Sequence, residues 1–197
     1  MSTEQPSPER ILQAAVRLFL EQSVRKTSAE EVAFQAGVTR VTVYRHFTDK
    51  QGLVRAVCSR IASIFERAAA DSRGRSIDEI EACLNQLGEE LSALAPGNLF
   101  PLIDEVRRLY PDVYEEFRAA REVAIDAIFQ HALAAAKRDG ALRKGLNQEV
   151  VRAIFLSGVV RLIETPSLIS SNVPPEEIVA TVTMFFRHGI LKDKPTG

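Results

Sequence analysis

Cysteine is scarce in this chain of 197 residues, which contains only Cys58 and Cys83. The two lie far apart and form no Cys-x-x-Cys motif, which excludes a disulfide-rich scaffold and a four-cysteine metal site. We therefore expect two reduced thiols, with no metal and no cofactor bound.

Long apolar runs are missing as well. No stretch approaches the roughly 18 apolar residues of a membrane-spanning helix. The first residues, MSTEQP, are polar and lack the basic and apolar segments of a signal peptide. These absences predict a soluble, cytoplasmic protein without a membrane contact.

Net charge is almost absent, since 25 Lys and Arg oppose 26 Asp and Glu, for a formal charge of −1. Residues 1–60 contain nine basic and six acidic side chains, a balance of +3, and the remainder contains sixteen and twenty, a balance of −4. A basic surface can therefore be hidden within a neutral total. An ordinary solvated face would give the same excess, so the excess is informative only beside a motif.

Motifs of common enzyme classes are also absent. His46, His131 and His188 lie in separate predicted helices and form no His-Glu-x-x-His pair. The sequence has no Gly-x-Ser-x-Gly, no phosphate-binding Walker loop and no Gly-x-Gly-x-x-Gly. We therefore predict that the protein is not an enzyme.

Helical periodicity is what the sequence does contain. Apolar residues recur at intervals of three and four, and no alternating strand pattern or hairpin turn stands out. Capping boxes, such as Ser28-x-x-Glu31, and stop signals, such as Gly37, delimit the segments. The fold class is therefore all-α, with helices at about 8–22, 28–36, 39–47, 48–70, 76–95, 99–109, 111–137, 147–164 and 174–191.

Three residues between positions 28 and 50 have the spacing of a helix-turn-helix. Ala33 is small enough for two helices to cross closely, Gly37 suits a turn with positive φ, and Val43 supplies an apolar residue to the second helix. These three alone fit any helical corner with a glycine as well as they fit a DNA-binding motif.

Residues 37–50, GVTRVTVYRHFTDK, make the pattern more specific. They resemble the signature of the TetR family of bacterial transcriptional regulators, roughly G-V-[ST]-x-G-[TS]-[LIV]-Y-x-H-F-x-[SND]-K, and the resemblance covers residues 8–60. Val41 stands where the family commonly has glycine, and no glycine occurs within residues 23–26. The first departure affects the expected sequence preference rather than DNA binding itself.

The resemblance implies a domain organisation. An N-terminal three-helix helix-turn-helix domain, residues 1–52, would be joined through the long fourth helix to a C-terminal helical ligand-binding and dimerisation domain, residues 53–197. The fourth helix would be the only connection between the DNA-binding helices and the rest, and would act as a lever.

The helix predicted at 39–47 is the candidate recognition helix. With 100° per residue and Val43 at the core, Thr39 and Phe47 share the inner side. Four side chains then point outward, namely Val41, Thr42, Tyr44 and Arg45.

Each outward residue type suits a DNA contact. Arg45 can pair bidentately with guanine, and Val41 can contact a thymine methyl group. Lys50, at the start of the next helix, can hold a phosphate together with backbone amides. The resemblance adds His46 as a backbone contact, although a packed histidine at the helix end fits equally. The predicted DNA-contacting residues are Thr27, Ser28, Thr39, Arg40, Val41, Thr42, Tyr44, Arg45, His46 and Lys50.

The last two predicted helices are apolar on more than one face. One face serves the core of the protomer, and a second needs another partner unless the core is simply thick. The resemblance implies a homodimer with a four-helix interface, for which the candidate residues are Val151, Phe155, Val159, Leu162, Val182, Phe185 and Phe186.

The resemblance also implies a small-molecule pocket within the fourth to seventh helices. Its aromatic candidates fit an ordinary core equally, and Arg161 fits an ordinary ion pair with Glu164 at helical spacing. The candidate pocket residues are Ile61, Phe65, Phe100, Ile103, Tyr110, Tyr114, Phe117, Phe129 and Arg161.

Taken together, these features predict a ligand-responsive transcriptional regulator. It would be a repressor that binds a palindromic operator in double-stranded DNA as a homodimer and is released by a small molecule. The alternative is a helical dimeric small-molecule sensor or interaction module without functional DNA binding.

Overall fold

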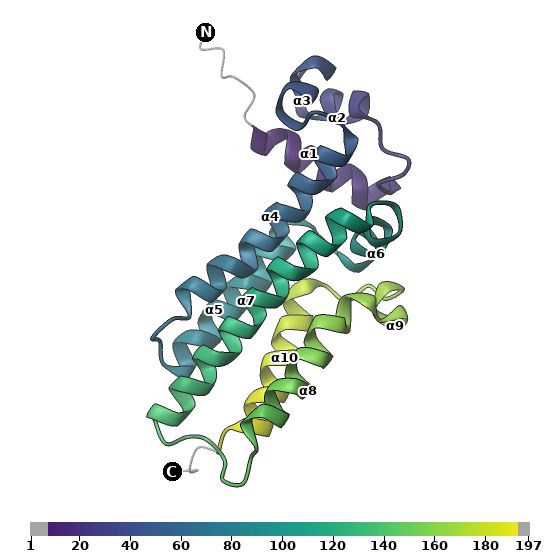
Figure 1. Ribbon diagram of the computed structural model, residues 1–197. Coiled ribbons are helices and arrows are strands. Elements are labelled where there is room, and N and C mark those ends of the chain that lie inside the picture. Colours follow the sequence, from purple (N-terminus) through teal and green to yellow (C-terminus); the bar gives the residue numbers. More distant parts are fainter. Residues whose placement is uncertain (1–7, 193–197) are drawn as a thin grey trace.

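A computed structural model describes residues 8–192 and shows an elongated helical molecule (Figure 1). No β-strand occurs within these residues, where one isolated bridge joins Leu142 and Leu191. The predicted all-α fold class is confirmed. The helices in chain order are α1 (Pro8–Gln22), α2 (Ala29–Ala36), α3 (Arg40–Phe47), α4 (Lys50–Asp71), α5 (Ile77–Leu94), α6 (Phe100–Leu109), α7 (Pro111–Arg138), α8 (Gln148–Arg161), η1 (Leu162–Glu164, a 3₁₀ turn), α9 (Pro166–Ile169) and α10 (Pro175–Ile190).

The first three helices form a small domain at one end of the molecule (Figure 1). Its core contains the buried side chains of Ile11, Val32 and Val43, one from each helix. Ser28 and Glu31 form the predicted capping box at the start of α2. Gly37 ends α2 with φ +66°, a left-handed conformation that a residue with a Cβ adopts at a cost. The turn and both helix boundaries therefore follow from local sequence.

Helix α4 joins the two ends of the molecule (Figure 1). It begins beneath α3 and packs along α5 and α7, because Leu53, Val57, Ile61 and Ile64 repeat at helical spacing and are buried. Helix α10 packs against α5, and α8 packs against α7. The domain boundary predicted at residue 52 falls in the first turn of α4, and the division itself stays a prediction.

The segment after α8 differs from the prediction. The helix predicted at 147–164 ends as α-helix at Arg161 and continues as η1, and a further short helix, α9, follows where a loop was expected. Pro166 opens α9 at the position where proline suits a helix start. The side-chain amide of Asn98 then donates to the carbonyls of Leu168 and Ser171, at 2.7 and 2.6 Å, and fixes the end of α9. This long-range contact has no local sequence signal.

None of the helices in the described range is both long enough and apolar enough to cross a membrane. Residues 1–7 and 193–197, which belong to the two predicted domains, lie outside the described residues.

Candidate DNA-binding surface and ligand cavity

The outward side chains of helix α3 make few contacts with the rest of the chain. Val43 is buried, whereas Val41 is 77% exposed and Arg45 and His46 are exposed. Arg45 forms no ion pair with any residue of the described range 8–192. Its guanidinium is therefore available to a partner outside the chain.

The hydroxyl groups around α2 and α3 act mainly as helix caps. Thr39 was expected on the inner side but is exposed, because its Oγ1 accepts the amide of Thr42 as the N-cap of α3. Ser28 caps α2 in the same way. Thr27 is only 2% exposed and its hydroxyl donates to the carbonyl of Ser23 at 2.8 Å. The DNA contact predicted for the Thr27 side chain is therefore not retained, because a buried hydroxyl cannot meet a phosphate.

Arg40 is held at the first turn of α3. Its guanidinium pairs with Glu30 of α2 at 2.5 Å and lies over the ring of Tyr44, 5.2 Å from the ring centroid. Phe34, one turn after Glu30, is 87% exposed on α2. The sequence analysis did not single out Phe34, although an exposed phenylalanine beside a helix-turn-helix is an unusual feature.

The turn from α3 to α4 is tight. Thr48 has φ +62° and ψ −58°, and the amide of Asp49 donates to the carbonyl of Phe47 at 2.6 Å, which is a strained γ-turn. Asp49 caps α4 by accepting the amide of Gly52 at 2.7 Å. A Cβ on Gly52 would lie 2.0 Å from the Phe47 carbonyl oxygen, so the turn requires glycine at this position.

Lys50 is less free than the sequence suggested. Its Nζ donates to the carbonyl of Arg25 at 3.1 Å, and partial burial lowers its pKa. The ammonium group keeps two further donors. Its phosphate contact therefore stays a prediction, alongside an observed role in holding the loop between α1 and α2.

A second connection reaches the small domain formed by α1, α2 and α3. The carboxylate of Glu105 on α6 accepts the amides of Val24 and Arg25, at 2.7 and 3.0 Å, in the loop between α1 and α2. The expectation that α4 alone joins the two parts is therefore wrong. Acidic residues on a helix surface carry no sign of such a distant backbone partner, so the sequence could not reveal this contact.

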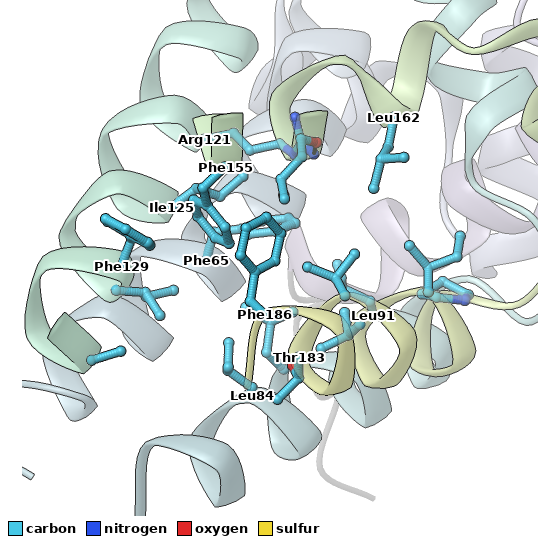
Figure 2. A pocket seen from close by; sticks show the side chains of 18 of the residues that line it. Phe65, Leu84, Leu91, Arg121, Ile125, Phe129, Phe155, Leu162, Thr183 and Phe186 are labelled. Atoms are coloured by element: carbon cyan, nitrogen blue, oxygen red, sulfur yellow. Dashed lines mark hydrogen bonds between the residues drawn. The ribbon is translucent and has the colours of Figure 1, made fainter. Parts of the chain in front are cut away.

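The larger part of the chain encloses a cavity of about 190 Å³. One water needs only ~10–15 Å³ of such space, so the cavity has room for an organic molecule. Figure 2 shows its wall, to which α4, α5, α7, α8 and α10 contribute side chains such as Phe65, Leu84, Phe129, Phe155 and Phe186. The lining is apolar except for Glu81, Arg121, Thr183 and Arg187. Such a wall with few polar groups is typical of small-molecule sites.

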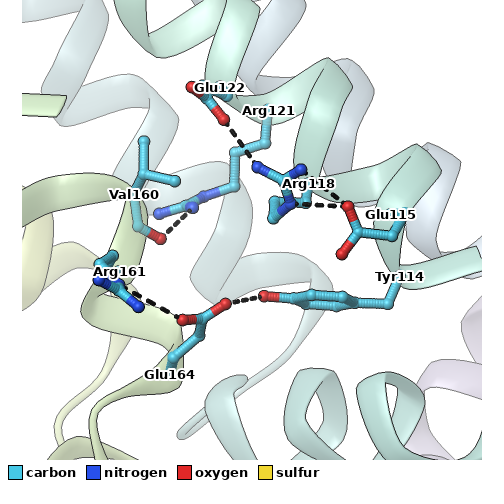
Figure 3. Close-up of polar contacts among 8 residues, drawn as sticks. All are labelled: Tyr114, Glu115, Arg118, Arg121, Glu122, Val160, Arg161 and Glu164. Carbon is cyan, nitrogen blue, oxygen red and sulfur yellow. Dashed lines mark hydrogen bonds and ion pairs between the residues drawn. The ribbon is translucent and has the colours of Figure 1, made fainter. Parts of the chain in front are cut away.

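Six of the nine predicted pocket residues lie in this lining, namely Ile61, Phe65, Phe100, Ile103, Phe117 and Phe129. Tyr110, Tyr114 and Arg161 do not. The Tyr114 hydroxyl instead donates to Glu164 at 2.6 Å, and Arg161 approaches the same carboxylate at 3.7 Å (Figure 3). Burial and this hydrogen bond raise the pKa of Tyr114. Whether the cavity binds a ligand stays a prediction.

Arg121 on α7 is the polar lining residue that sequence reasoning missed. It is 5% exposed and donates to the backbone carbonyls of Val159 and Val160, each at 3.0 Å. Its guanidinium lies over the ring of Phe65, 5.4 Å from the ring centroid. Burial lowers its pKa to about 10, so the group remains protonated near neutral pH.

The residues predicted for a dimer interface occupy different positions. Phe155, Val159, Leu162, Val182 and Phe186 line the cavity. Phe185 is 70% exposed, and Val151 is half-buried outside the lining. A helix with apolar residues on both sides gives no indication of which side faces inward, and this ambiguity explains the difference. The other exposed large apolar residues of α8 and α10 are Val150, Ile154 and Met184.

Comparisons with known proteins agree with this geometry. Residues 11–57 match the family model described as bacterial regulatory proteins, tetR family. YvkB of Bacillus subtilis, an HTH-type transcriptional regulator, is 35% identical over 79 residues, which cover 40% of this chain and only 38% of YvkB. TtgR of Pseudomonas putida, another such regulator, is 29% identical over 174 residues and 80% of each chain.

The fold of the whole chain is also found among solved structures. SmeT of Stenotrophomonas maltophilia, the repressor of the multidrug efflux pump SmeDEF, superposes with a TM-score of 0.63 at 20% identity, covering 98% of this chain and 96% of SmeT. The helix-turn-helix geometry, the matched family model and this shared fold lead to one assignment. Residues 11–57 form a helix-turn-helix domain of the tetR family of bacterial regulatory proteins, and the chain as a whole shares the fold of SmeT.

Proposed function

We propose that this protein is a transcriptional repressor that binds a palindromic operator as a homodimer and is released by a small molecule. The observation that supports it most is the outer side of α3, where Val41, Arg45 and His46 are exposed over the packed Val43. A helix placed in this way can enter the major groove and read base edges.

The homodimer is supported by exposed apolar residues on two helices. Val150 and Ile154 on α8 and Met184 and Phe185 on α10 are exposed in the single chain. Phe185 contacts the ring of Phe186, which in turn contacts Phe155 of α8, so the two helices are linked by aromatic packing. Large apolar side chains gathered in this way favour a protein partner, and a second copy would bury the same stripe twice.

Release by a small molecule is supported by the position of the cavity. Its wall includes Ile61 of α4 and Ile103 of α6, and both helices also contact the DNA-binding domain. A ligand that moves either helix changes the orientation of α3 and weakens DNA binding, and DNA must then weaken ligand binding by the same factor. SmeT, whose fold this chain shares, has been solved in complex with triclosan.

The experiment is a titration of the full chain with the DNA upstream of its own gene at several salt concentrations. We expect Arg45→Ala to relax the preference at one base position at a cost of ~1–3 kcal/mol. Lys50→Ala should weaken binding to all sequences and reduce the salt slope by about one. Circular dichroism of both variants checks that the domain is folded.

Wild-type binding by both variants, with no difference between operator and random DNA, would contradict the assignment of α3. Absence of any sequence-specific binding by the wild-type chain would favour the alternative of a sensor without functional DNA binding.

A further inference from the structure

We propose that the cavity binds an apolar molecule with a single carboxylate, and that the Arg121 guanidinium is the partner of that carboxylate. The inference rests on the proposed function only in taking the cavity as the effector site. Four observations on charge and geometry carry it.

The first observation is that Arg121 is a buried cation without an acidic partner. Among residues 8–192, none forms an ion pair with it. The nearby acids have other partners, since Glu164 accepts the Tyr114 hydroxyl and Glu122 pairs with Arg118 at 3.0 Å (Figure 3). A buried charge is costly unless it is paired, and carbonyl dipoles compensate it only in part.

The second observation is the geometry of the guanidinium. Its hydrogen bonds to Val159 and Val160 use one N–H of each terminal nitrogen. A guanidinium has five N–H donors in a planar fork, which matches the two oxygens of a carboxylate. Figure 2 shows Arg121 beside Phe65 and Phe155 on the wall of the cavity. A carboxylate bound here would accept hydrogen bonds from the remaining N–H donors of Arg121.

The third observation is that the other charges of the lining cancel. Arg187 on α10 pairs with Glu81 on α5 and approaches Asp78 at 3.7 Å. The Glu81 carboxylate is therefore already paired with Arg187, and no other carboxylate belongs to the lining among the described residues. The cavity has no partner for a cationic ligand, and its one unpaired charge is positive.

The fourth observation is that the rest of the wall is apolar. Side chains such as Leu84, Leu91, Ile125 and Phe186 belong to the same lining as Arg121 (Figure 2). A chain or ring of hydrocarbon would bury its surface against them, and the acid group would determine its orientation.

The test uses three probes with the same tail, namely decanoate, 1-decanol and decylamine. Their binding to the full chain is measured by calorimetry at pH 7.5 without DNA. We expect decanoate to bind at least about tenfold more tightly than 1-decanol, because a charge-assisted hydrogen bond replaces an unpaired cation, and decylamine to bind most weakly. Equal affinity for decanoate and 1-decanol, or no binding of either, would overturn the inference.

Variants then locate the contact. In Arg121→Gln, the preference for decanoate over 1-decanol should disappear while 1-decanol binds as before. Arg161→Gln is the matched control, because Arg161 is an exposed arginine outside the lining, and the preference should persist there. Persistence in Arg121→Gln would contradict the assignment. If Arg121→Gln does not fold, the comparison of the three probes on the wild-type chain still decides whether the cavity prefers a carboxylate.

A further measurement, of operator binding in the presence of each probe, distinguishes this inference from the proposed function. If decanoate binds with the expected preference but does not weaken operator binding, the cavity inference stands and release by a ligand fails. If operator binding is weakened equally by decanoate and 1-decanol, release stands and the role of Arg121 is wrong.

Discussion

At the scale of single residues, Gly52 shows how the chain positions its recognition helix. Its amide is held by Asp49, and its missing side chain leaves room for the Phe47 carbonyl. We expect Gly52→Ala to destabilise the protein by about 1–3 kcal/mol, because the added methyl group forces the turn between α3 and α4 apart. DNA binding should fall as well, since α3 loses its support.

Gln51→Ala is the matched control, because it alters the preceding residue of the same helical turn and adds no atom near Phe47. Thermal unfolding and DNA titration of both variants check the expectation. Equal melting temperatures for Gly52→Ala and Gln51→Ala would show that the turn has room for a side chain.

The two thiols should differ in reactivity. Cys58 is buried on α4 and burial raises its pKa to about 12, whereas Cys83 on α5 is half-buried. At pH 8 only roughly one Cys58 in ten thousand is a thiolate, which is the reactive form. We expect iodoacetamide to label one thiol of the native chain, at Cys83, and two after denaturation. Peptide mass spectrometry identifies the site, and labelling of native Cys58 would contradict its burial.

Arg121 illustrates what a single sequence can and cannot reveal about a site. Phe117, Arg121, Ala124 and Ile128 recur at intervals of four, three and four, so Arg121 lies on the buried side of α7. That spacing is visible in the sequence and would have identified a buried cation. The carbonyls that receive its hydrogen bonds belong to α8, and only the fold brings them there.

At the scale of helices, local signals explain most of the boundaries. Capping residues at Ser28, Thr39 and Ser76 mark helix starts that the structure reproduces. Local signals could not predict the orientation of α8, because apolar residues occur on both of its sides. Only packing against α7 decides which side faces the cavity. Residues shared by a core and an interface look alike in a sequence, since both are apolar.

Helix α6 should contribute to communication between the cavity and the DNA-binding domain. The Glu105 carboxylate holds two backbone amides of the loop between α1 and α2, and Ile103 of the same helix lines the cavity. In Glu105→Gln one acceptor oxygen becomes an NH₂ group, which cannot accept. We expect the free energy of unfolding to fall by about 1–3 kcal/mol and the amides of Val24 and Arg25 to exchange with solvent faster.

Asp104→Asn is the control on the same helix, because the partners of Asp104 among residues 8–192 are only Arg107 and Arg108 of α6. Hydrogen exchange measured by NMR distinguishes the two variants. Unchanged protection at Val24 and Arg25 in Glu105→Gln would remove α6 from the proposed route between ligand and DNA.

At the scale of the whole molecule, the DNA-binding helices lie apart from the cavity, whereas the exposed apolar residues lie on helices that also line it. The DNA-binding helices form one end, the cavity lies within the larger helical part, and the exposed apolar residues lie on α8 and α10 (Figure 1). Because Phe155 and Phe186 line the cavity and Phe185 faces outward, the two helices contact both the cavity and the proposed partner. In the proposed homodimer, a ligand in the cavity would therefore influence the relative position of the two protomers as well as the tilt of α4.

The homodimer gives the last expectation. Phe185 is exposed in the single chain, so Phe185→Glu should leave the protomer folded with nearly the same helical content. In a symmetric dimer the same substitution places two carboxylates in one apolar interface, at a cost of several kcal/mol for each ion.

We expect the wild-type chain to sediment as a dimer at micromolar concentration and the variant as a monomer. Operator binding should weaken strongly, because each recognition helix then binds its half-site alone. Phe34→Glu, which alters another exposed phenylalanine in the DNA-binding domain, should remain dimeric. A wild-type monomer, or a Phe185→Glu variant that still dimerises, would show that the exposed residues of α8 and α10 have a different role.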